Sequence, residues 1–158
     1  MPVFNFSEEI WMYKTILVPL DGSKRAERIL THVEALAQCL KAKVIFLQVV
    51  RYPNIVAYQE MEILLYRKDI EQLKKQATDY LTAQKGKFRG KGIEAKICVV
   101  NGSVVREIID CSEREGADLV AMTSHGRSGL ARVFYGSVAA GVLQVIDRPL
   151  LIIRSRGD

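Results

Sequence analysis

The chain has 158 residues, of which 49% are hydrophobic and 26% are charged, which is the size and balance of one globular domain. This length excludes two full domains, and it allows a core that needs neither disulfides nor a structural metal. The 23 Lys and Arg against 18 Asp and Glu give a formal charge of +5, which favours anionic ligands without choosing among them.

The first third of the chain alternates between apolar strands and an amphipathic helix. Residues 14–23 predict a buried strand, because an apolar β-branched run is closed by Pro19 and by the Asp21-Gly22 turn. A helix is predicted from Ser23, a favourable N-cap, because apolar side chains follow at spacings of three and four. Residues 44–50 predict a second strand covered on both faces, and 51–60 predict a loop.

The rest of the chain repeats this alternation. A long helix is predicted from Met61 to Lys85, and the glycines and basic residues of 86–92 predict a mobile, solvated connection. Alternating polarity over 93–100 predicts a strand near an edge of the sheet. The remaining predicted elements are a helix from 103 to 116, a strand over 118–124, a helix over 137–146 and a last strand beginning at 149.

This order predicts an α/β fold over residues 1–158, a doubly wound five-stranded parallel sheet with helices on both faces, preceded by an N-terminal arm over 1–13. If the last strand lies at the rim of the sheet, Leu150–Ile153 leaves an apolar edge unpaired. We expect the same strand of a second copy to cover this edge in a homodimer. The alternative cover is the N-terminal arm, with Phe4, Phe6 and Trp11.

The three cysteines, Cys39, Cys98 and Cys111, are far apart in the sequence and lack the spacing of a zinc or redox site. We interpret them as buried thiols in a reducing compartment. No apolar run approaches the roughly 18 to 20 residues that span a membrane. The N-terminus also lacks the basic flank and apolar region of a secretion signal, so we expect a cytoplasmic protein without a membrane partner.

In a doubly wound sheet, ligands bind beyond the carboxyl ends of the strands, where the strand order reverses. Three segments are predicted to converge there: Asp21-Gly22, Val49-Val50 and the stretch from Met122 to Val138. The sequence therefore predicts a ligand crevice between the first, second and fourth strands.

The loop after the fourth strand has the outline of an anion cradle. Gly126 and Gly129 allow close backbone approach, and Gly136-Ser137 begins the last helix, whose N-terminus offers amides and a positive dipole. Arg127 and Arg132 add positive charge. The competing interpretation is that the two loop glycines only turn the chain and that Ser137 caps the helix.

Three stretches of the sequence resemble the universal stress protein family: VPLDGS at 18–23, SHGRSGLARVFYGSV at 124–138 and RPLLIIR at 148–154. The resemblance covers nearly the whole chain. The nucleotide signature of that family is a glycine, two residues, a glycine, nine residues, and then Gly-Ser or Gly-Thr. Gly126, Gly136 and Ser137 match it here, and Thr123 stands at the first glycine.

The resemblance implies an adenine nucleotide alpha hydrolase-like fold with strand order 3-2-1-4-5, a dimer through the last strand, and a regulator or sensor in stress response. Its expected ligand is ATP, or ADP, AMP or cyclic AMP, with Mg²⁺ bridging the phosphates when an ion is present. Asp21 would serve the adenine and ribose, the Val49 backbone would meet the adenine, and Met122 and Thr123 would flank the ribose. The phosphates would be held by the amides of Gly126, Gly136, Ser137 and Val138 and by the Ser137 hydroxyl.

The threonine at position 123 has two alternative interpretations. Its β-branched side chain can fill part of the site where the family has a bare glycine, or its hydroxyl can bond the ribose. We expect Thr123→Gly to keep or tighten nucleotide binding.

Other function classes are less supported. Asp21, His125 and Ser124 or Ser137 could meet near one pocket, but nothing in their spacing shows a hydrolytic triad, so no catalytic residue is assigned and at most slow ATP hydrolysis is expected. A second alternative is the branch of the family that does not bind nucleotide and acts by protein contact. The basic run around Phe88 is short and has one aromatic residue, so no nucleic-acid partner is expected.

Overall fold

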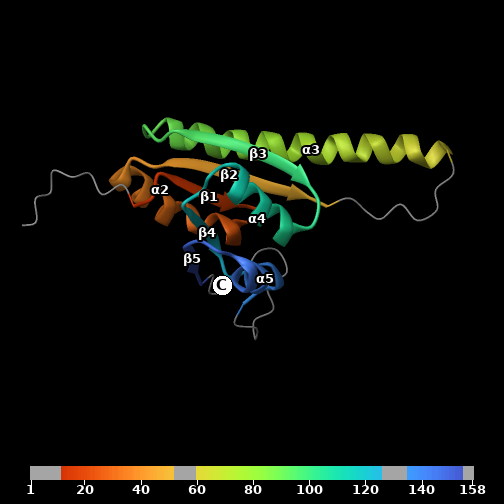
Figure 1. The fold of residues 1–158 in the computed structure, drawn as a ribbon. Coiled ribbons are helices and arrows are strands. Elements are labelled where there is room, and N and C mark those ends of the chain that lie inside the picture. The colour runs from red at the N-terminus through yellow and green to blue at the C-terminus, as the bar shows by residue number, and fades with distance from the viewer. Residues whose placement is uncertain (1–11, 52–59, 126–134, 155–158) are drawn as a thin grey trace, which may run out of the picture.

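A computed structural model describes residues 12–51, 60–125 and 135–154, with the backbone alone over 60–66. It shows a five-stranded parallel sheet in the order β3-β2-β1-β4-β5, with helices on both faces (Figure 1). The predicted fold class and strand order are confirmed. The strands are β1 Thr15–Pro19, β2 Lys43–Val50, β3 Ala95–Asn101, β4 Leu119–Thr123 and β5 Leu150–Ile153.

The predicted helices are all present. The first is divided at Arg28 into a segment of 4 residues and one of 12. Ser23 caps the first segment as predicted, accepting a hydrogen bond from the Ala26 amide at 3.1 Å. The helices are α1 Lys24–Glu27, α2 Ile29–Leu40, α3 Glu60–Arg89, α4 Val104–Arg114 and α5 Ser137–Val145. None of the helices in the described part of the chain has the length and apolarity needed to cross a bilayer.

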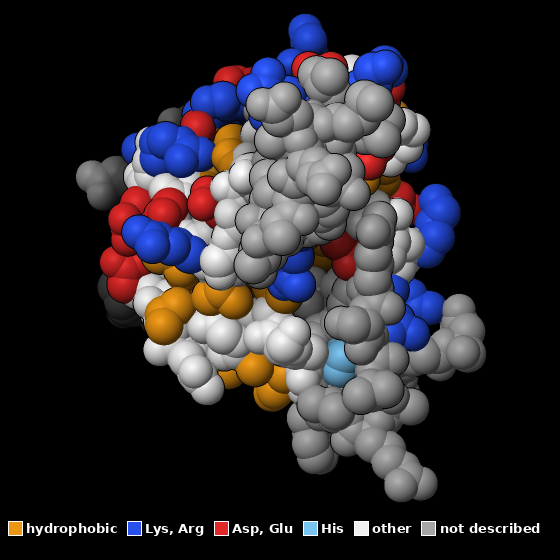
Figure 2. All heavy atoms as spheres, turned by 90° about the vertical axis from the view of Figure 1, so that its right-hand side faces the viewer, with side chains coloured by type: hydrophobic (Ala, Val, Ile, Leu, Met, Phe, Trp, Pro, Cys, Tyr) orange, Lys and Arg blue, Asp and Glu red, His pale blue; other side chains and the backbone are white. Residues whose placement is uncertain are grey.

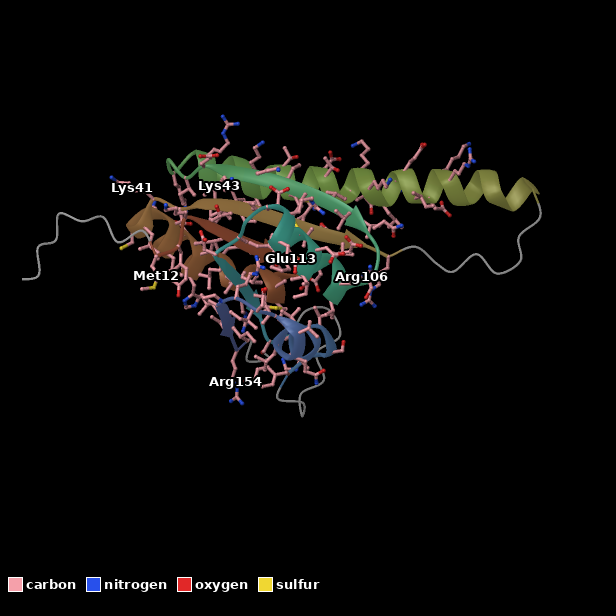
Figure 3. All side chains as sticks on the ribbon, viewed as in Figure 1. Met12, Lys41, Lys43, Arg106, Glu113 and Arg154 are labelled. Atoms are coloured by element: carbon pink, nitrogen blue, oxygen red, sulfur yellow. The ribbon has the colours of Figure 1, made fainter. Side chains whose placement is uncertain are left out.

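Two apolar clusters hold the layers together, because successive side chains of a strand point to opposite faces of the sheet. Ile16 and Val18 of β1 face the cluster beneath α1, α2 and α3. Leu17, between them, faces the cluster beneath α4 and α5. The opposite face of α4 is polar, and Arg106 and Glu113 project from it into solvent (Figure 3).

The predicted mobile connection at 86–92 is wrong, because α3 continues to Arg89. The reason is Phe88, which is only 3% exposed and packs edge-on against Phe46 of β2 with ring centroids 5.0 Å apart. Burial of this ring offsets the helix-breaking tendency of Gly86, whose missing side chain would meet only open space. The turn after the helix falls at Gly92, which has a φ of +76°.

The prediction of three buried thiols is also wrong in part. Cys111 is buried and Cys98 is half-buried, but Cys39 is exposed. Cys39 follows the buried Ala37 by two positions on α2, which places it on the solvent side of that helix.

The two edge strands of the sheet differ in what lies beside them. β3 is an edge strand, as predicted, and α3 runs alongside it (Figure 1). β5 forms the opposite edge and pairs with β4 only, within the described residues. The alternative cover for β5, the arm with Phe4, Phe6 and Trp11, lies outside the described residues, as does nearly all of the predicted loop at 51–60.

Candidate functional site

A cavity of about 640 Å³ lies at the carboxyl ends of β1, β2 and β4, where the strand order reverses. This volume is in the range of small-molecule sites. All described members of the predicted site line it: Asp21, Val49, Met122, Thr123, Gly136, Ser137 and Val138. Gly126 and Arg127 lie outside the described residues, together with Gly129 and Arg132.

Figure 2 looks onto the side where the strands end, and Lys and Arg side chains gather along its upper rim, over α3.

The turn after β1 fixes Asp21 at the cavity. Gly22 has a φ of +80°, a left-handed conformation that side chains disfavour. The turn lets the Ser23 amide donate to Oδ1 of Asp21 at 2.9 Å. The carboxylate is therefore anchored at the entry to α1, and it places negative charge at the cavity wall.

The end of β2 presents its backbone to the cavity. The Lys43 amide donates to Lys14 O and Leu47 O accepts from the Leu20 amide, so the odd-numbered residues of β2 direct their backbone groups towards β1. β1 pairs with β2 only as far as Pro19, opposite Leu47. The N–H and C=O of Val49 therefore lie beyond the end of β1, where they face the cavity instead of a neighbouring strand.

The end of β4 is buried and tied to the loop that follows it. Thr123 is 6% exposed, and its hydroxyl donates to the His125 carbonyl at 2.8 Å. Towards a ligand, this hydroxyl can therefore act only as an acceptor. Ser124 is also buried, with its Oγ 3.1 Å from Nδ1 of His125. Asp21 is the third member of the triad considered from the sequence, and its carboxylate accepts a hydrogen bond from the Ser23 amide.

The start of α5 points its backbone amides at the same cavity. Gly136 is the N-cap, so the interpretation that Ser137 caps the helix is wrong, and Ser137 is the first helical residue. The amides of Ser137 and Val138 belong to the first turn and have no preceding helical carbonyl to bond. They form the positive end of the helix dipole, which is a favourable position for an anion.

Gly136 leaves no room for a side chain. Its amide donates to Ser124 O at 2.7 Å, and a Cβ at this position would lie 3.0 Å from the same oxygen. The backbone of the helix start is therefore packed closely against the end of β4.

One wall of the cavity was not predicted. α3 contributes Leu73, Gln76, Ala77 and Tyr80. Burial raises the pKa of Tyr80 well above its ordinary value, and the nearby Glu27 carboxylate adds to the rise, so its hydroxyl stays protonated. The sequence predicts the long helix that carries these residues, but nothing in it connects that helix to the site.

Comparisons with known proteins agree on one family. A model described as "Universal stress protein family" matches residues 12–154. The universal stress protein MJ0577 of Methanocaldococcus jannaschii is 30% identical, over 93% of this chain and 98% of its own length. The solved structure of MJ0577 has a TM-score of 0.78 and covers 93% of this chain and 99% of its own. A solved universal stress protein in complex with cAMP, 22% identical with a TM-score of 0.59, covers 90% of this chain and 98% of its own.

Proposed function

We propose that this chain, which belongs to the universal stress protein family, binds an adenine nucleotide in the cavity at the ends of β1, β2 and β4 and acts as a nucleotide-dependent regulator. One observation carries the proposal. A single cavity joins a strand backbone that can read a base with a helix N-terminus that can hold phosphates.

The base would be read by Val49. The Watson–Crick edge of adenine offers a donor, the 6-amino group, beside an acceptor, N1. The C=O and N–H of Val49, which extend past the end of β1, have the complementary polarity. Met122, which is 6% exposed, supplies apolar surface nearby.

The phosphates would be held by the start of α5. Ser137 and Val138 line the cavity at the helix start, where their amides and the Ser137 hydroxyl would bind the phosphates, and Gly136 allows the backbone to come close. Among the described residues no group of three or more His, Cys, Asp and Glu is placed to hold a metal. A Mg²⁺ ion would therefore enter bound to the phosphates rather than to a carboxylate cluster.

Structural relatives favour an adenine nucleotide over other anions. One solved universal stress protein is in complex with cAMP, and one from Archaeoglobus fulgidus is in complex with dAMP. The fold is shared with both. ATP, ADP, AMP and cyclic AMP are all candidates, and a titration with each ranks them.

Asp21→Asn is expected to weaken ATP binding about tenfold to a hundredfold, because a hydrogen bond from a ribose hydroxyl to a charged group is lost. The amide oxygen of Asn can still accept the Ser23 amide, so the turn is kept. Calorimetric titration measures the affinity, and an unchanged unfolding midpoint of the free protein serves as the control. Equal affinities of the two proteins would remove Asp21 from the site.

We also propose that a second copy of the chain pairs with the open edge of β5. All its residues are apolar and only half-buried, and Leu143 and Val145 of the adjoining α5 are 52% and 58% exposed. Pro149 O and Ile153 O accept from the amides of Val120 in β4 and of Ser124, the residue that follows it. By alternation, the N–H and C=O of Ile152 point outward, towards a partner strand.

Ile152→Pro is expected to turn a dimer into a monomer, because proline removes the outward N–H and is tolerated at an edge. Ile152→Val keeps that N–H and should remain dimeric. Sedimentation velocity gives the mass of each. A dimeric proline variant, or a monomeric native protein, would contradict pairing through β5.

A further inference from the structure

Two of the three cysteines meet across the face of the sheet that α4 covers. Cys98 lies on β3 and Cys111 on α4, and both pack in the apolar cluster beneath α4 and α5. Nη2 of Arg114, which lies one turn after Cys111 on α4, donates to Sγ of Cys98 at 3.5 Å, so this part of α4 lies over Cys98. Beside burial, the Cys98 side chain also contributes to the raised pKa of Cys111. The thiols are therefore neighbours in space, although 12 residues separate them in the sequence.

The two sulfurs have different surroundings. Cys98 is half-buried at the edge strand, and Nη2 of Arg114 donates to its Sγ at 3.5 Å. The guanidinium places positive charge beside this sulfur, and its partial exposure leaves it reachable from solvent. Cys111 is 0% exposed, and burial together with Cys98 raises its pKa to about 12, so it remains a thiol shielded from solvent.

We propose that Cys98 and Cys111 form a reversible disulfide when the protein meets hydrogen peroxide, with Cys98 as the attacking sulfur and Cys111 as the resolving one. This site is separate from the nucleotide chemistry proposed above. In reducing compartments, such bonds are typically transient and serve redox sensing.

The reaction balances in two steps. The Cys98 thiolate attacks one oxygen of the peroxide, the O–O bond breaks, and the departing hydroxide takes a proton to become water, leaving a sulfenic acid. The sulfur of Cys111 then attacks the sulfur of the sulfenic acid. The S–O bond breaks, and the thiol proton leaves with the hydroxyl group as a second water. Two thiols lose two electrons, and one peroxide gains them.

The test uses the native full chain. After reduction and removal of reductant, the protein is treated with equimolar hydrogen peroxide, denatured, alkylated and weighed by mass spectrometry. The proposal predicts loss of the mass of two hydrogen atoms, one alkylated thiol instead of three, a linked peptide pair containing Cys98 and Cys111, and full reversal by dithiothreitol.

Three variants test the roles of the individual cysteines and of Arg114, so the test does not depend on the folding of any one variant. Cys39→Ser is the matched control, since Cys39 is exposed on the far side of the sheet, and it should form the same bond. Cys111→Ser should stop at a sulfenic acid that dimedone traps on Cys98. Arg114→Gln should slow the reaction about fivefold to tenfold. If the native protein keeps Cys111 fully alkylatable while Cys98 is overoxidised, or links two copies through Cys39, the proposal is overturned.

Discussion

Gly136→Val is expected to abolish nucleotide binding, with a loss of affinity of about a hundredfold or more, because charge-assisted hydrogen bonds from the start of α5 are lost together. A Cβ at Gly136 already lies 3.0 Å from Ser124 O, which is tighter than nearly all real contacts, and valine adds two methyl groups. The side chain either enters the space for the phosphates or displaces the first turn of α5. Both outcomes remove the anion cradle.

A matched substitution separates this effect from a general loss of stability. Gly86→Val places the same side chain on α3, where a Cβ meets nothing within 4 Å, and it should leave ATP affinity unchanged. Gly136→Ala should fall between the native protein and the valine variant, since the neighbours need to move by only a few tenths of an ångström. Native affinity in a folded Gly136→Val protein would rule out the assigned phosphate site.

Phe88→Ala is expected to lower the free energy of unfolding by about 3 to 5 kcal/mol, the usual cost of removing a buried phenyl ring. The ring is 3% exposed and packs at 87° against Phe46, where it joins the end of α3 to β2. Urea unfolding followed by circular dichroism measures the change. Arg89→Ala, at the exposed neighbouring position, should change stability by less than about 0.5 kcal/mol.

The same pair of variants decides between two descriptions of residues 86–92. If Phe88→Ala costs less than about 1 kcal/mol, the segment behaves as the solvated connection that its composition predicts. A loss several times larger supports the helix that ends at Arg89.

This segment shows where prediction from the sequence ends. The strands were predictable because apolar runs such as residues 44–50 are long enough to be recognised locally and need cover on both faces. The end of α3 was not, because its helical state depends on contact between Phe88 and Phe46, which are far apart in the chain. The strand order came from the family resemblance rather than from periodicity.

The candidate site was also predictable only in part. Asp21, Val49 and Thr123 could be brought together from the sequence because parallel strands end at a common edge. The wall formed by Gln76 and Tyr80 could not, because it depends on where α3 crosses that edge. The meeting of Cys98 with Cys111 was missed for a related reason: only the packing of α4 on β3 reveals it.

The central claim is tested most directly by calorimetric titration of the purified, nucleotide-stripped protein with ATP and Mg²⁺, repeated with AMP and cyclic AMP. We predict saturable binding of one nucleotide per chain by at least one of them, and its loss in Gly136→Val. Absence of binding by all of them would contradict the nucleotide site and leave protein contact as the function of this chain.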